Sequence, residues 1–97
     1  MMDVPAKHLA LLKQIFESEL PEVSVWVFGS RANGKAKRYS DLDLVLHHDK
    51  PIDGLTLFHL KERLAESDLP FTVDLVEWTK MSQNFQKIIE KNHVPLF

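Results

Sequence analysis

The run Val23-Ser24-Val25-Trp26-Val27-Phe28 stops abruptly at Gly29-Ser30, and ten residues later a second run begins as Ser40-Asp41-Leu42-Asp43-Leu44. The first run is β-branched and aromatic, and apart from Ser24 it is apolar on both faces, which is typical of a buried central strand. The second run predicts another strand over Leu42–His47. A Gly-Ser turn suits a phosphate group and an Asp-x-Asp pair suits a divalent metal, so the two runs together predict a site for a nucleoside triphosphate.

Three further segments have apolar residues at spacings of three and four, which predicts amphipathic helices. The expected helices are Ala6–Glu19, Leu55–Glu66 and a last helix that starts after Ser82 as its N-cap and carries Phe85, Ile88 and Ile89. A third strand is expected over Phe71–Trp78. This order predicts an α/β (α+β) fold, with helices packed against a small mixed sheet. The third strand could follow the second through a right-handed parallel crossover or run antiparallel, and the sequence leaves both open.

Length and composition limit the classes of protein that the chain can represent. Its 97 residues predict one domain over 1–97. Zero cysteines exclude disulfides and thiolate metal sites, and this fits the cytoplasm. A net charge of −2 gives no overall attraction to nucleic acid or to an anionic membrane. No apolar stretch approaches the roughly 20 residues that span a bilayer, so we expect neither a membrane nor a direct nucleic-acid partner.

Three acidic residues are the candidate metal ligands. Asp41 and Asp43 project to one face, because residues i and i+2 of a strand share a face. Asp74 stands inside the apolar run of the third strand, where an unpaired carboxylate would be costly. Converging carboxylates take up protons or bind a cation, and Mg²⁺ prefers carboxylate oxygens together with substrate phosphates. The alternatives are ordinary: an Asp-x-Asp pair is usually a surface pair, and Asp74 could simply face water on an edge strand.

The candidate nucleotide-binding residues lie in and around the loop between the first two strands. Gly29 lets the backbone approach a phosphate closely, and Ser30 offers a hydroxyl and an N–H. Basic residues follow at Arg31, Lys35, Lys37 and Arg38, with no acid among them. Such a run is usually a solvated face, but beside a Gly-Ser turn it could also attract phosphates. We therefore expect Gly29, Ser30, Arg31 and Ser40 to contact the nucleotide.

The order of these motifs resembles the signature of the polymerase-beta-like nucleotidyltransferase superfamily. That signature is a Gly-Ser pair, a spacer, an Asp-x-Asp pair and a later strand aspartate, and here it is matched by Gly29-Ser30, ten residues, Asp41-x-Asp43 and Asp74. The small size and the Ser-Asp-Leu-Asp-Leu sequence are similar to its minimal nucleotidyltransferase (MNT) branch, and the resemblance covers about Val4 to Asn92. It implies that Asp41, Asp43 and Asp74 bind two Mg²⁺ ions and form the catalytic site. It also implies AMP transfer from ATP to a tyrosine of a HEPN-domain ribonuclease, with this chain as the antitoxin of a toxin–antitoxin system.

Other functions stay open at this point. The chain could neutralise a HEPN partner by binding alone, with an idle site. A different Asp-x-Asp enzyme, such as a sugar transferase or a haloacid-dehalogenase-type phosphatase, is disfavoured because the chain has no room for its further segments. The apolar segment Val94–Phe97 could contact a partner or pack on its own domain, and a homodimer is equally open.

Overall fold

The computed structural model describes residues 4–29, 31–32 and 41–96, and within them all three predicted helices are present. They are α1 at Ala6–Glu19, α2 at Gly54–Glu66 and α3 at Gln83–Lys91. The Ser82 side chain accepts a hydrogen bond from the Phe85 N–H (3.2 Å), which confirms Ser82 as the N-cap of α3. Asp53 does the same for α2 by accepting from the Thr56 N–H (3.1 Å). These caps explain why both helices begin where they do.

Four strands of the described part of the chain form one sheet, whereas the sequence predicted three. They are β1 at Ser24–Phe28, β2 at Leu42–His47, β3 at Val73–Glu77 and β4 at Val94–Pro95, in the order β3-β2-β1-β4. β3 is shorter than predicted because Trp78–Lys80 turns into a 3₁₀ helix, η1. The short strand β4 pairs with the free edge of β1, and Leu96 N–H donates to Val25 O (2.8 Å) just beyond it. The C-terminal apolar segment therefore packs on its own domain through residue 96.

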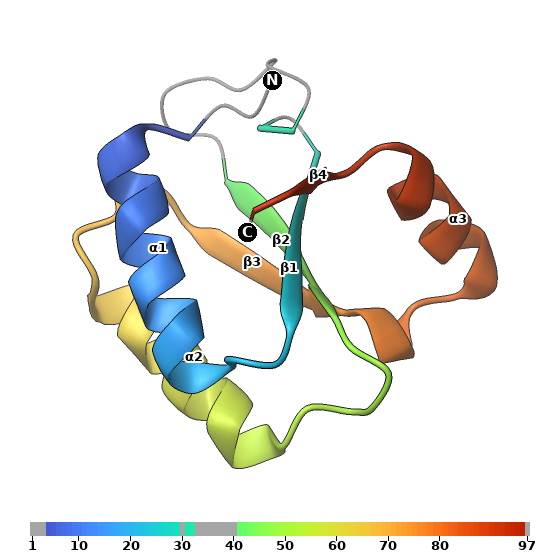
Figure 1. Ribbon diagram of the computed structural model, residues 1–97, viewed down its shortest axis with the longest axis horizontal. Coiled ribbons are helices and arrows are strands. Elements are labelled where there is room, and N and C mark those ends of the chain that lie inside the picture. Colours follow the sequence, from blue (N-terminus) through green and yellow to red (C-terminus); the bar gives the residue numbers. More distant parts are fainter. Residues whose placement is uncertain (1–3, 30, 33–40, 97) are drawn as a thin grey trace.

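The pairing of the strands settles the question of direction that the sequence left open. β1 pairs antiparallel with β2, and β2 pairs parallel with β3. The parallel pair is joined by α2, so β2, α2 and β3 form a crossover unit (Figure 1). Both β1 and β2 lie inside the sheet with a neighbour on each side, which confirms β1 as a central strand.

One face of the sheet packs on α1 and α2, which lie side by side, and α3 lies on the other side of the sheet (Figure 1). The core between the sheet and the first two helices contains Leu12, Ile15, Phe16, Leu20, Val25, Val27, Ala32, Leu42, Leu44, Leu46, Leu60, Leu64, Phe71 and Leu96. Because side chains alternate along a strand, Asp43 and Val45 of β2 point away from this core. The sheet therefore has a packed apolar face and a second face that carries acidic and aromatic side chains.

An aromatic cluster holds the C-terminal part of the chain against the second face. The Trp26 ring is stacked between His47 (centroids 4.1 Å apart) and His93 (3.9 Å). Trp78 meets Trp26 and His47 edge-on, at 5.4 and 4.8 Å. His93 directly precedes β4, so its stacking helps to place that strand beside β1.

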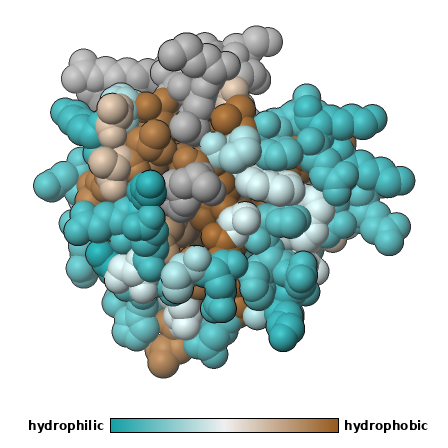
Figure 2. Space-filling view, viewed as in Figure 1, coloured by the Kyte–Doolittle hydropathy of each residue, from teal (hydrophilic) through white to brown (hydrophobic). Residues whose placement is uncertain are grey.

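The visible surface of the molecule is mostly hydrophilic, with hydrophobic atoms exposed chiefly towards its centre (Figure 2). α3 carries two exposed apolar side chains, Phe85 and Ile88, and α2 carries Leu55 and Phe58. Within the described residues, no helix has both the length and the apolar character needed to cross a bilayer.

Candidate functional site

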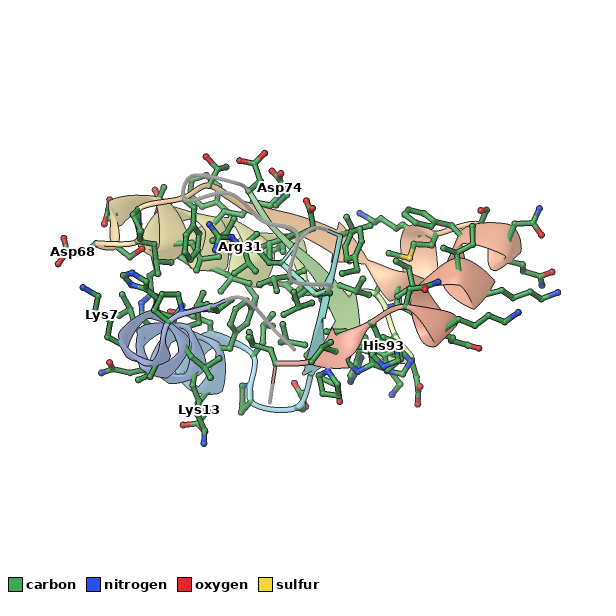
Figure 3. The ribbon with its side chains drawn as sticks, turned by 90° about the horizontal axis from the view of Figure 1, so that it is seen from above. Lys7, Lys13, Arg31, Asp68, Asp74 and His93 are labelled. Carbon is green, nitrogen blue, oxygen red and sulfur yellow. The ribbon has the colours of Figure 1, made fainter. Side chains whose placement is uncertain are left out.

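The sheet register brings two of the three predicted acids side by side. Asp43 of β2 and Asp74 of β3 are direct Cα partners in the parallel pair. Paired residues on neighbouring strands lie about 4.8 Å apart and point to the same face. Asp74 is exposed and Asp43 is half-buried. In Figure 3, Asp74 lies at the outer margin of the molecule, well away from the loop acid Asp68.

Asp41 adds the third negative charge. It lies immediately before β2, is exposed, and stands two residues from Asp43. The pKa of the Asp43 carboxyl is raised above its ordinary value of 3.8, first by burial and then by the charges of Asp74 and Asp41. Asp43 is therefore repelled by both of the other acids, and a bound cation would relieve this repulsion.

The acids do not form a closed cage by themselves. Among the residues that the structure describes, no group of three histidine, aspartate or glutamate side chains is close enough to hold a metal ion. Mg²⁺ is usually bound by one or two carboxylates, with the remaining positions filled by substrate phosphates and water. The carboxylates present fit that pattern, because Asp43 and Asp74 offer oxygens at an open face of the sheet.

The predicted glycine turn lies at the same end of the sheet as the acids. Gly29 follows Phe28, which is the Cα partner of Asp43 in the antiparallel pair. Its φ of +75° belongs to the left-handed region that favours glycine. A Cβ at this position would lie 2.7 Å from Oδ2 of Asp43, so a glycine is required for the carboxylate to sit where it does. Ala32 N–H donates to Gly29 O (3.1 Å) and closes the turn.

The remaining predicted nucleotide-binding residues have different outcomes. Ser30 and Ser40 lie outside the described residues, as do Lys35, Lys37 and Arg38. Arg31 is described, and its side chain is only 3% exposed. Its guanidinium carbon lies 4.2 Å from the centre of the Phe71 ring. Its direct contact with a nucleotide therefore stays a prediction.

Sequence reasoning missed the role of Phe71 as the partner of Arg31. The residue was assigned to the third strand, but it lies two positions before β3 and is buried. Its apolar character was the only signal in the sequence, and apolar character does not identify a partner so distant along the chain.

Comparisons with known proteins agree with this geometry. Residues 9–97 match the family model described as "Nucleotidyltransferase domain". The chain is 46% identical over 93 residues to a Haemophilus influenzae protein named probable protein adenylyltransferase MntA, covering 96% of this chain and 82% of that protein.

Two solved structures have the same fold. One is a toxin–antitoxin crystal structure with AMP-PNP. The match covers 96% of this chain and 73% of the chain in that structure, with a TM-score of 0.74 and 22% sequence identity. The other is a complex of a tri-AMPylated Shewanella oneidensis HEPN toxin with MNT antitoxin. The match covers 94% of this chain and 70% of the chain in that structure, with a TM-score of 0.69 and 20% sequence identity. At these identities the likeness shows the fold.

Proposed function

Because the chain belongs to the nucleotidyltransferase domain family, we propose that it transfers AMP from ATP to a tyrosine hydroxyl of a HEPN-domain toxin and thereby acts as its antitoxin. The observation that carries this proposal is the pairing of Asp43 with Asp74 beside the glycine turn at Gly29. The name of the Haemophilus relative supports the reaction. The neighbours with AMP-PNP and with an AMPylated toxin support the donor and the acceptor. Residues 1–97 would act as one domain. The site of action would be the cytoplasm, where ATP is present.

The acids and the turn have separate roles in this proposal. Asp41, Asp43 and Asp74 would hold two Mg²⁺ ions, which when bound neutralise phosphate charge and polarise the oxygens that attack and leave. The backbone at Gly29 is free of a side chain and would face the triphosphate, together with Ser30 and Ser40 of the neighbouring loop. Bound Mg²⁺ would also offset the repulsion from Asp74 and Asp41, which adds to burial in raising the pKa of Asp43.

The proposed reaction is an in-line displacement at the α-phosphorus of ATP. The acceptor oxygen forms a bond to that phosphorus, and the bond to the bridging oxygen of the β-phosphate breaks. Pyrophosphate leaves with the electron pair of the broken bond. Asp74 is exposed on the edge strand β3, and in this proposal its carboxylate would accept the proton of the incoming hydroxyl.

A labelled-ATP experiment tests this function. The purified protein, a cognate HEPN-domain protein, Mg²⁺ and ATP labelled at the α-phosphate should yield a labelled HEPN protein. The double variant Asp41→Asn with Asp43→Asn should lose this transfer by at least about a hundredfold, because it removes two metal-binding carboxylates. Asp68→Asn is the matched control, since it removes an exposed acid remote from the site (Figure 3).

A second function is kept because α3 exposes Phe85 and Ile88, which favours a stable contact with another protein. In that case the chain would neutralise its HEPN partner by binding alone. No label transfer at saturating ATP and Mg²⁺, with full protection by the double asparagine variant, would support binding alone and contradict catalysis.

A further inference from the structure

A buried arginine directly follows the glycine turn, and its environment differs from that of an ordinary phosphate ligand. The Arg31 side chain is 3% exposed, and its guanidinium lies over the face of the Phe71 ring, 4.2 Å from the ring centre. In Figure 3, Arg31 lies among the side chains inside the molecule, while Asp74 lies at its margin. A planar guanidinium stacks well on an aromatic face, which an ammonium group cannot reproduce.

Phe71 is held in place through its ring and through the backbone of the residue that follows it. His8 of α1 meets it edge-on, with ring centroids 5.7 Å apart. The next residue along the chain, Thr72, accepts a hydrogen bond through its carbonyl oxygen from the N–H of Leu42 (2.8 Å). Leu42 lies between the two acids Asp41 and Asp43. The segment under Arg31 is therefore tied to the start of β2 and leads directly into β3.

We propose that Arg31 is a positioning residue whose guanidinium, packed on Phe71, holds the glycine turn at a fixed distance from the acids of β2 and β3. The turn at Gly29 would bind the triphosphate, and the acids would bind its metal ions, so their separation decides whether both can engage one ATP molecule. This role rests on the proposed function. Arg31 acts on the nucleotide through the position of the turn, and Phe71 shares the role.

The test compares variants of the two stacked residues. Arg31→Met removes the guanidinium and keeps an unbranched apolar stem, and Phe71→Leu removes the aromatic face. Each should weaken ATP binding, measured by calorimetry in Mg²⁺ without acceptor, by about tenfold to a hundredfold, as expected for a misplaced binding group. The double variant should be no worse than the worse single variant, within about threefold, because both changes break the same contact between Arg31 and Phe71. Phe71→Tyr keeps the ring and should bind ATP as the wild type does.

Arg63→Met is the matched control. Arg63 also makes a specific contact, with Glu19 at 3.1 Å, but it lies on α2 among residues that form no part of the site. Its ATP affinity should equal that of the wild type even if its melting temperature falls. The same variants are compared for KM and kcat in the label-transfer assay.

Each remaining outcome has a distinct meaning. Weaker ATP binding in Arg31→Met with normal binding in Phe71→Leu would show that Arg31 does not act through Phe71, and it would overturn the positioning role. Lower melting temperatures with unchanged ATP affinity and KM would overturn it as well, since the contact would then serve stability alone. A wild-type protein that binds ATP but transfers no label would refute the proposed function and leave the positioning role to be judged on ATP affinity. A wild-type protein that binds no ATP would refute both.

Discussion

Gly29 combines a backbone requirement and a space requirement in one residue. Its φ of +75° suits glycine, and the space that a Cβ would occupy is filled by the carboxylate of Asp43. Asparagine or aspartate can adopt the left-handed backbone conformation, but neither can leave this space free, because every side chain other than that of glycine begins with a Cβ. The glycine therefore decides both the shape of the turn and the place of a candidate metal ligand.

Gly29→Ala should impair stability and activity together. Left-handed backbone costs an L-residue about 1–2 kcal/mol, and the new Cβ would push the Asp43 carboxylate from its place. We expect the melting temperature to fall by roughly 4–8 °C for each kcal/mol lost, and label transfer to fall by at least about tenfold. Thermal unfolding and the transfer assay measure the two effects.

Gly54→Ala provides the control for this substitution. Gly54 is the first residue of α2, and no heavy atom lies within 4 Å of the Cβ that alanine would add. Alanine is the better helix former by about 1 kcal/mol in a helix interior, so stability should stay the same or rise. Normal transfer by Gly29→Ala would show that the turn does not constrain the site.

At the scale of elements, helices and strands with long, regular patterns were predicted well, and elements set by distant contacts were not. The apolar periodicity of α1 and the β-branched run of β1 were sufficient for their assignment. β4 has only two residues and contains Pro95, so it has no alternation to detect, and it exists because β1 offers a free edge. The direction of β3 depends on how α2 packs across the sheet, which no local pattern of β3 records.

The same distinction applies to the candidate site. Asp41 and Asp43 are neighbours in the sequence, so their common face follows from the period of a strand. The pairing of Asp43 with Asp74 depends on the register of a parallel crossover. The residues themselves left open whether the two acids converge, and only the family resemblance implied it. The contact of Arg31 with Phe71 joins a turn to a segment before another strand, and it was not predicted.

His93→Ala should loosen β4. The imidazole stacks on Trp26 at 3.9 Å, and its Nδ1 lies 2.8 Å from Ile89 O. Loss of an aromatic pair costs about 0.5–1.5 kcal/mol beyond the area that it buries. We expect a lower free energy of unfolding in denaturant titrations, and faster hydrogen exchange at the Leu96 N–H, which bonds to Val25 O.

Two further variants separate stacking from other effects. His93→Phe keeps a flat ring and should restore most of the protection at Leu96. His59→Ala removes an exposed histidine that lies 4.0 Å from Glu62, and it should change stability by less than about 0.5 kcal/mol. Unchanged exchange at Leu96 in His93→Ala would mean that the backbone pairing alone holds β4.

At the scale of the whole molecule, the acid cluster links folding stability to pH and, under the proposed function, to Mg²⁺. The pKa of Asp43 is raised in the folded protein, so the folded state binds its proton more tightly than the unfolded state does. The contribution of protonated Asp43 to the free energy of unfolding is therefore fully present below pH 3.8, the ordinary pKa of the group. It is lost as the pH rises through the higher pKa of the folded state. Without metal, ionised Asp43 weakens the fold at neutral pH.

Asp43→Asn should remove that dependence. Without metal, the variant should melt at a higher temperature than the wild type at pH 7, and the difference should shrink as the pH falls towards 3.8. Mg²⁺ should raise the melting temperature of the wild type at pH 7, since a ligand that binds only the folded state stabilises it. The variant should respond less to Mg²⁺, and Asp68→Asn should respond as the wild type does. An equal Mg²⁺ response in Asp43→Asn would exclude Asp43 from the metal site.

The parallel pairing of β2 with β3 has a consequence for a chain that is still being made. Asp41, just before β2, and Asp43, within β2, are synthesised almost together, but Asp74 joins them only after α2 has crossed over and β3 has paired with β2. A nascent or half-assembled polypeptide therefore lacks one of the three acids of the proposed metal site. Under the proposed function, the ability to bind ATP with Mg²⁺ would then appear only after the sheet is complete.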